Sequence, residues 1–310
     1  MIKLWIILLF GLFGVEDRTD KDHQKFAGHL EVLIPELLNN YNVPGIAVGL
    51  IKDGEPVWNK GFGFTDRDQS SPITSDTYFR AESMTKSLTA WSVMVLVEQG
   101  AIHLDDPVEK HLTRWEFPES EYDSSEITIR KLLNHSAGLP FSIFDNVDMD
   151  KHESQERVLE ELAEYQNMIV QQPGKSFKYS NPGYIVLELL IEEVSGESYP
   201  DFIAKKLLQP LQMHHSGFEL TPEIKENAIT GYQYNGNPVH LKSEPIHAHG
   251  ALLTTVRDFS QFVAAGTMVS DIGKEILSHQ QILFQVCHNT MVGSCTFRFH
   301  DISLEYKTFP

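Results

Sequence analysis

FRAESMTKSLTA, residues 79–90, leads into an apolar segment that ends before Gly100. The expected helix from Ser83 to Gln99 carries apolar side chains on nearly every side. Gly100 is a typical residue beyond a helix C-terminus. A helix that is apolar on nearly every side packs in the interior of a protein. The sequence therefore predicts a buried helix over residues 83–99 that begins at Ser83.

Ser83 and Lys86 form the one Ser-x-x-Lys pattern in the chain. A separation of three residues places the hydroxyl and the ammonium on one helical face, within reach of each other. Burying a lysine costs free energy unless its charge is paired or used, and the first turn of a helix favours the negative charge of an activated serine. The spacing alone fits a nucleophile beside its base, and it fits equally an N-cap serine beside a lysine that reaches solvent.

The segment before this helix predicts a further helix and a hairpin. Apolar residues that recur at steps of three and four predict the helix, which should end near Asn40: Phe26, Leu30, Leu33 and Leu37. Residues 46–51 and 57–64 flank Asp53-Gly54, a strong signal for a two-residue hairpin turn.

The rest of the chain predicts mostly helices. A mainly helical inserted region covers residues 90–240, and the expected helices lie at residues 129–134, 153–170, 183–195, 256–266 and 272–286. Residues 296–306 alternate like a short terminal hairpin. The predicted fold class is α/β, in an α+β arrangement with an antiparallel sheet flanked by helices.

The composition fits one large globular domain. The 310 residues are 41% hydrophobic and 22% charged, which supplies enough apolar material for a core. Lys and Arg number 25 against 43 Asp and Glu, and the net charge of -18 repels nucleic-acid phosphates and anionic lipid surfaces. We therefore expect no nucleic-acid partner.

The N-terminal residues predict a secretion signal. Lys3 precedes an apolar run over residues 4–15, which is shorter than the ~20 residues that cross a bilayer. We expect residues 1–15 to be a signal peptide, residues 16–24 a linker and residues 25–310 the folded domain. The mature protein would then be secreted and have no membrane span; a buried N-terminal helix is the alternative.

The two cysteines, Cys287 and Cys295, could pair after export to an oxidising compartment. His288 and His300 lie near them but lack the spacing of a zinc site. We assign neither a metal nor a cofactor.

The residues around Ser83 closely resemble the nucleophile region of the serine β-lactamase-like family. This family includes class C β-lactamases, D-alanyl-D-alanine peptidases, related esterases and eukaryotic lactamase-like proteases. Further similar blocks follow in the family's order, at residues 61–66, 127–140, 207–213, 216–218 and 249–258. The resemblance covers residues 25–280 and implies the β-lactamase/transpeptidase-like fold.

Tyr179-Ser180-Asn181 resembles the family's Tyr-x-Asn motif, which lies on a loop that faces the nucleophile. Tyr165-Gln166-Asn167 has the same pattern but falls in a predicted helix, where residues two apart point away from each other, and we discard it. Taken by itself, Tyr179 also fits a buried aromatic residue whose hydroxyl is hydrogen-bonded.

The resemblance implies acyl transfer, in which Ser83 attacks a carbonyl, Lys86 and Tyr179 handle its proton, and water releases a covalent acyl-enzyme. Asn181 would bind the acyl-side amide of a small-molecule or peptide substrate, and the Ser83 N–H would be one oxyanion-hole donor. Either Lys86 or Tyr179 could be the base, because a nearby cation is what stabilises a phenolate at neutral pH. His135 and His249 are predicted to be loop-packing residues, since Ser83 lacks the Gly-x-Ser-x-Gly context of a triad.

The C-terminal sequence departs from the family pattern. The family's third motif, Lys-Thr-Gly or His-x-Gly, lines the active site on a strand and supplies the second oxyanion donor, and no such string follows Gly250. Lys307-Thr308-Phe309 lacks the glycine, and residues 281–310 do not resemble the family, so the C-terminal strands are expected to be incomplete. Loss of one oxyanion donor lowers turnover by ~10²–10³.

The sequence thus predicts a secreted serine hydrolase that acts on an amide, ester or lactam bond, with activity impaired by the missing motif. The alternatives are a catalytically inactive protein that uses the same fold to bind a ligand, and a truncated isoform without independent function.

Overall fold

The computed structural model describes residues 7–10, 21–141, 158–163, 168–233, 235–267 and 270–277. Its helices are α1 (Lys21–Tyr41), α2 (Thr85–Glu98), α3 (Ile129–Leu133), α4 (Val158–Ala163), α5 (Pro182–Ser195), α6 (Tyr199–Ile203), α7 (Pro222–Asn227) and α8 (Val256–Ala265). Its strands are β1 (Ile7–Phe10), β2 (Gly45–Lys52), β3 (Glu55–Gly63), β4 (Phe79–Arg80), β5 (Gly231–Tyr232), β6 (Pro238–Val239) and β7 (Leu253–Thr254). Of the helices in these ranges, none is long and apolar enough to cross a membrane.

The main sheet has the order β1-β2-β3, with β2 antiparallel to β3 and parallel to β1. The predicted hairpin is confirmed, and Asp53 and Gly54 at its turn have φ angles of 52° and 82°. A type I′ turn requires positive φ at both central residues, which explains the Asp-Gly pair. The signal peptide stays a prediction; four of its residues, Ile7–Phe10, form β1 here.

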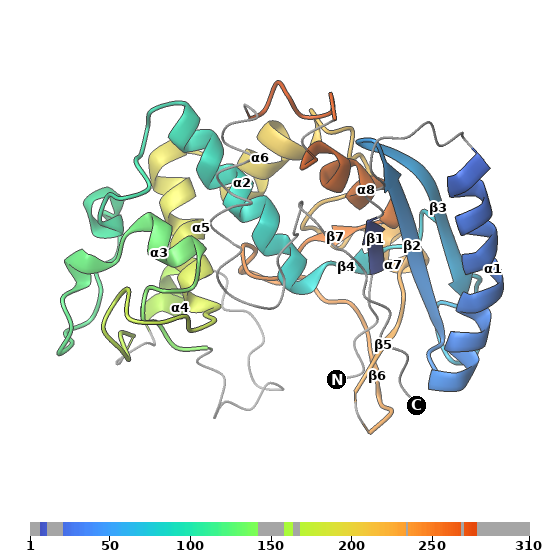
Figure 1. Cartoon of the computed structure of the whole chain (residues 1–310). Helices are drawn as coiled ribbons and strands as arrows, with labels where there is room; N and C mark the ends of the chain where they lie inside the picture. The colour runs from blue at the N-terminus through green and yellow to red at the C-terminus, as the bar shows by residue number, and fades with distance from the viewer. Residues whose placement is uncertain are drawn as a thin grey trace.

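Helix α1 covers one face of this sheet (Figure 1). Ala27, Leu30 and Ile34 of α1 pack against Val48 and Leu50 of β2. The predicted helix is confirmed, but its predicted apolar face is partly wrong. Phe26 and Leu37 are 46% and 40% exposed, because the sheet contacts the neighbouring stripe of the helix.

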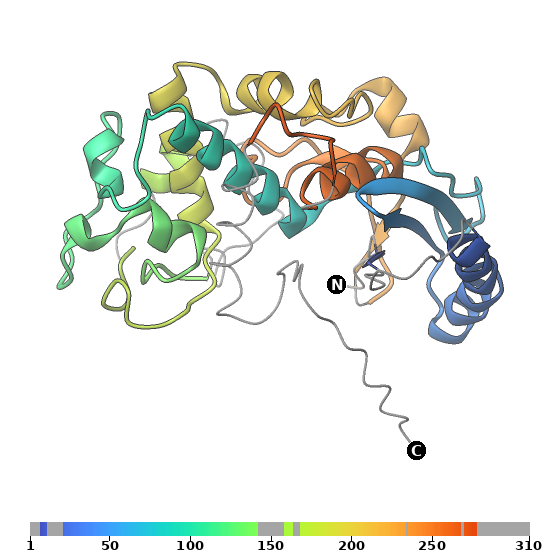
Figure 2. The same cartoon turned by 45° about the horizontal axis from the view of Figure 1, so that its top comes forward.

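Helix α8 packs against β2 and β3 from inside the molecule (Figures 1 and 2). Ala47 of β2 joins Val256 of α8 and Phe79 of β4 in one buried cluster. Successive side chains of a strand point to opposite faces, so Ala47 and Val48 contribute to different clusters. Both faces of β2 are therefore covered, which explains its almost continuous apolar sequence.

Helix α2 runs through the middle of the molecule, between α8 and the helical part formed by α3, α4 and α5 (Figures 1 and 2). Its residues Leu88, Val93 and Met94 are at most 1% exposed, which confirms the predicted buried helix. The α-helix begins at Thr85, and Ser83 lies in a preceding 3₁₀ turn, Glu82–Met84. In the described part of residues 90–240 the secondary structure is mainly helical, as predicted, with β5 and β6 as a short hairpin.

Two of the predicted helices are partly wrong. Within residues 153–170, helix is present at α4, but residues 168–170 are not helical because the Val170 N–H bonds to the Gly138 carbonyl at 2.9 Å. Residues 272–277 form turns, since Gly273 has a φ of 79° and lies close against Ala265. Four further predictions lie outside the described residues: the rest of the helix at 272–286, the hairpin at 296–306, the alternative motif Tyr165-Gln166-Asn167 and the pairing of the two cysteines.

Candidate active site

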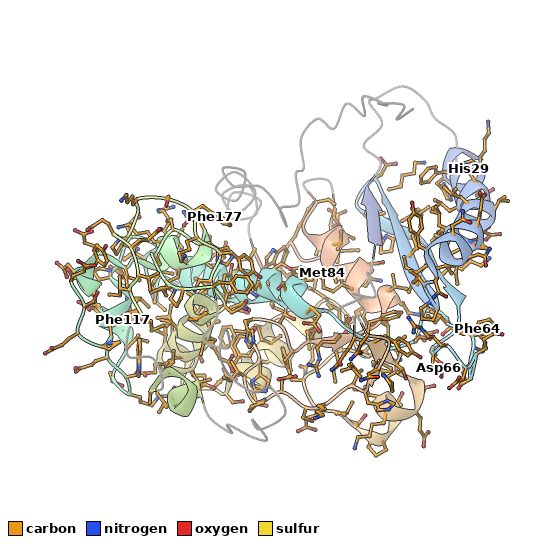
Figure 3. All side chains as sticks on the ribbon, turned by 90° about the horizontal axis from the view of Figure 1, so that it is seen from below. His29, Phe64, Asp66, Met84, Phe117 and Phe177 are labelled. Atoms are coloured by element: carbon orange, nitrogen blue, oxygen red, sulfur yellow. The ribbon has the colours of Figure 1, made fainter. Side chains whose placement is uncertain are left out.

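Pairing between β4 and β7 brings two distant segments together beside Ser83. Phe79 pairs with Thr254 and Arg80 with Leu253, and the Ala81 N–H donates to the Leu252 carbonyl at 2.8 Å. The chain before β7 therefore passes next to the start of α2. Figure 3 labels Met84 at this start, between the helical part of the molecule and the sheet with α1.

The structure brings Ser83, Lys86 and Tyr179 together. The Tyr179 hydroxyl donates a 2.8 Å hydrogen bond to Oγ of Ser83. The Nζ of Lys86 donates to the same oxygen at 3.4 Å and lies 5.0 Å from the centroid of the Tyr179 ring. The Ser83 side chain is half-buried, so part of it reaches solvent.

Lys86 is buried, and its amine lies against a backbone carbonyl and two aromatic rings. The residue is 6% exposed, and its Nζ donates a 2.6 Å hydrogen bond to the His249 carbonyl. The Nζ also lies 5.5 Å from the Tyr184 ring centroid, in addition to the Tyr179 ring. A carbonyl acceptor and aromatic faces both stabilise an ammonium ion. The bond to His249 is much shorter than the one to Ser83, so of these two partners the carbonyl holds the amine more closely.

His135 holds the loop that carries Tyr179. Its ring packs on the Tyr179 ring at 4.4 Å between centroids, its Nδ1 accepts from the Ser180 N–H at 3.2 Å and its carbonyl accepts from the Lys178 N–H at 2.7 Å. Burial, and secondarily the positive charge of Lys86, lowers the pKa of His135 to about 3. A neutral His135 therefore packs against the loop, as predicted.

Asn181 follows this loop and is the N-cap residue of α5. Its N–H donates to the Phe141 carbonyl at 3.0 Å. Its side-chain oxygen Oδ1 is buried and has no hydrogen-bond partner among the described residues. Buried polar atoms are seldom left unpaired, so this oxygen is available to accept a hydrogen bond from a ligand.

Sequence reasoning missed Glu188, which is 1% exposed in α5 and hydrogen-bonded to the segment beside Lys86. The available signal was a single charge inside the apolar run of residues 184–191. In the described part of the chain, no group of three or more His, Cys, Asp and Glu side chains could hold a metal ion.

Comparison with known proteins identifies the chain's relatives. The Beta-lactamase family model matches residues 30–289. The chain belongs to the β-lactamase family. Protein flp of Staphylococcus aureus is 29% identical over 230 residues, which are 73% of this chain and 45% of that protein. Unguisins hydrolase ungD' of Aspergillus campestris is 30% identical over 264 residues, which are 81% of this chain and 48% of that protein. The chain thus spans about half the length of the curated relatives it matches.

Solved structures of the β-lactamase fold match as well. The octameric penicillin-binding protein homologue from Pyrococcus abyssi is 33% identical with a TM-score of 0.70, over 83% of this chain and 59% of that one. A class C β-lactamase in complex with cefoxitin is 23% identical with a TM-score of 0.69, over 84% of this chain and 70% of that one. These matches confirm the predicted β-lactamase/transpeptidase-like fold and the resemblance to this family.

Proposed function

We propose that this β-lactamase-family chain is a serine hydrolase that cleaves an amide, ester or lactam bond through a covalent acyl-enzyme. The observation that carries the proposal is the convergence of the Tyr179 hydroxyl and the Lys86 amine on Oγ of Ser83, at 2.8 and 3.4 Å. A serine hydroxyl becomes a nucleophile when an adjacent group can take its proton, and these two side chains are placed to do so.

In the proposed acylation step, Oγ of Ser83 forms a bond to the substrate's carbonyl carbon while its proton passes to the Lys86–Tyr179 pair. The bond to the leaving group then breaks, and the leaving group receives that proton. In deacylation, the pair takes a proton from water, the hydroxide attacks the ester carbonyl, and the proton returns to Oγ as the acid leaves. Tyr179 as phenolate or Lys86 as free amine could act as the base, because each lies within reach of Ser83.

The proposed substrate is a small molecule or peptide with an amide near the scissile carbonyl. The unpartnered Oδ1 of Asn181 supports this choice, since it could accept from the N–H of such an amide. The backbone N–H of Ser83 would donate to the oxyanion. The names of two relatives agree with the reaction class: one is a hydrolase and one was solved in complex with cefoxitin.

We also propose that the protein is secreted and acts after removal of residues 1–15. The single Lys3 and the apolar run after it support export. The high negative charge supports a substrate other than nucleic acid. Expression in a secreting host, followed by mass measurement of the protein from the medium, should give a chain that has lost this leader.

The function is tested by hydrolysis of a chromogenic ester and a chromogenic cephalosporin. The wild type should turn over at least one of them, and Ser83→Ala should lower the rate by ~10³ or more. Ser87→Ala is the matched control, because Ser87 lies on the same helix and donates to the Met84 carbonyl instead. Equal rates for Ser83→Ala and the wild type would overturn the proposal, and tight binding of the cephalosporin without turnover or adduct would favour the inactive binding protein.

A further inference from the structure

Glu188 is a carboxylate in the middle of an apolar helix. It is 1% exposed and lies in α5 between Leu187 and Leu189, both 0% exposed. A buried carboxylate is tolerated only when hydrogen-bond donors or a cation compensate its charge. A leucine would fill such a position without that desolvation cost, so the charge at this position requires an explanation.

Both oxygens of Glu188 bind one short segment, the turn at residues 247–250. Oε2 accepts from the backbone N–H groups of His247 and Ala248, at 2.8 and 2.7 Å. Oε1 accepts from Nδ1 of His247 at 2.8 Å. Three donors on two adjacent residues fix the position of the turn relative to α5, because a carboxylate accepts such bonds more strongly than a neutral group does.

The carbonyl groups of the same turn bind α2. The Ala248 carbonyl accepts from Oγ1 of Thr89 at 2.7 Å, and the His249 carbonyl accepts from Nζ of Lys86 at 2.6 Å. The turn therefore links the carboxylate in α5 to the amine at the candidate active site. A shift of the turn would move the carbonyl that binds the amine of Lys86.

The imidazole of His247 is also held in place by aromatic side chains. It stacks on the Tyr199 ring at 6.1 Å between centroids with 9° between the planes, and it contacts the Phe218 ring edge-on at 5.2 Å. The Tyr199 hydroxyl is hydrogen-bonded to Oγ1 of Thr89 at 2.7 Å. The ring of His247 is thus packed against two aromatic side chains, one of which is hydrogen-bonded to α2.

We propose that Glu188, together with His247, is a positioning residue for Lys86 that acts through the turn at residues 247–250. This inference rests on the proposed function, because the position of the amine matters to a reaction at Ser83. The carboxylate holds the His249 carbonyl where it orients the amine toward Ser83, and its negative charge favours the protonated form of the Lys86–Tyr179 pair.

The inference predicts the direction of a pH effect. Several titratable groups of the described residues face Lys86 or Glu188. Those near Lys86 are Tyr179, Tyr184, His135 and His249, and those near Glu188 are His247 and Tyr199. The reactive form of the Lys86–Tyr179 pair carries one proton fewer than the unreactive acid form, whichever residue is the base. Removing the negative charge of Glu188 disfavours the more positive acid form. The acid limb of the rate profile should therefore move to lower pH.

The test measures, against pH, the second-order rate at which a fluorophosphonate probe phosphonylates Oγ of Ser83 with loss of fluoride. Glu188→Gln keeps the shape of the side chain and removes the charge. It should lower the plateau rate by about ten-fold or more and move the midpoint of the acid limb to lower pH. Leu190→Ala is the control, because position 190 lies on a different side of α5 and its truncation only weakens packing. It should leave the midpoint unchanged.

A second pair of variants covers the case in which Glu188→Gln does not fold. His247→Asn can place an amide nitrogen where Nδ1 lies, and it should retain the wild-type midpoint. His247→Leu removes the donor and should lower the rate of Ser83 phosphonylation. The positioning role is overturned if the wild type labels at Ser83 and the Glu188→Gln and His247→Leu variants have the same pH–rate profile as the wild type. It is also overturned if Leu190→Ala moves the midpoint as far as Glu188→Gln does. Failure of the wild type to label at Ser83 would instead overturn the proposed function and the inference with it.

Discussion

The hydroxyl of Tyr179 donates a 2.8 Å hydrogen bond to Oγ of Ser83, across a sequence separation of 96 residues. His135 makes this contact stable, since it packs on the Tyr179 ring and bonds to the loop on both sides of it. The phenol and the serine are therefore held in place before any substrate binds, which lowers the cost of reaching a reactive geometry.

Tyr179→Phe should lower the rate of Ser83 labelling by ~10²–10⁴, because the variant lacks the hydroxyl that is hydrogen-bonded to Oγ and that shares the proton transfer in the proposed mechanism. The ring would still pack against His135, so the thermal midpoint should change little. Stopped-flow labelling and differential scanning calorimetry measure the two effects. A variant that reacts as fast as the wild type would show that the phenol has no part in proton transfer.

Lys86→Met should lower the same rate by ~10³ while leaving the free energy of unfolding equal or higher. The activity falls because the amine beside Ser83 is lost. The stability is kept because an apolar side chain of similar length removes the cost of burying the amine, which offsets the hydrogen bond lost by the His249 carbonyl. Urea unfolding, read beside the labelling rate, checks both; a severe loss of stability would show that the ammonium is mainly structural.

Asn181→Ala should raise KM or lower kcat/KM for substrates with an acyl-side amide by about ten-fold or more, with little loss of unfolding free energy. The variant removes Oδ1, which has no partner among the described residues. Donors on the substrate would lose their acceptor, while the described part of the protein loses no bond to that atom. An ester without the amide serves as the control substrate, and an equal loss on both substrates would contradict a role in amide binding.

The stability of the protein should fall as the pH drops below about 6.5. Burial, and secondarily Lys86, lowers the pKa of His135 and of His249 to about 3. Between ~pH 6.5 and about 3 the unfolded chain binds protons that the folded chain excludes, so acid favours unfolding; above ~pH 6.5 neither state binds them and the effect vanishes. Each histidine changes the free energy of unfolding by at most ~1.4 kcal/mol per pH unit. The partial exposure of both residues to solvent makes the actual change smaller.

His249→Leu isolates this effect. Urea unfolding at about pH 7 and about pH 5 should show a smaller difference in unfolding free energy for the variant than for the wild type, because one of the two excluded protons is gone. An unchanged difference would mean that His249 titrates alike in the folded and unfolded states.

Local patterns in the sequence were enough to predict the elements that carry the site. The Asp53-Gly54 turn, the buried helix after Ser83 and the Ser83–Lys86 spacing depend on neighbours a few residues away. The buried stripe of α1 could not be predicted as well, because the sheet determines which side is covered. Phe26 is exposed and Ala27 is buried for that reason.

The long-range contacts of the site required other information. The approach of Tyr179 to Ser83 was expected from the family resemblance, since no spacing rule connects residues so far apart. The link from Glu188 to His247 joins residues 59 apart and left only an unusual charge in an apolar run as its signal. Such pairs are decided by how α5 and the segment before β7 pack together.

The most direct test of the account is to locate the adduct that a fluorophosphonate or β-lactam probe forms with the protein. Peptide mapping by mass spectrometry should place a single adduct on Ser83 in the wild type and in Ser87→Ala, and none in Ser83→Ala. No adduct in the wild type, or an adduct that remains after Ser83 is replaced, would contradict the assignment of Ser83 as the nucleophile.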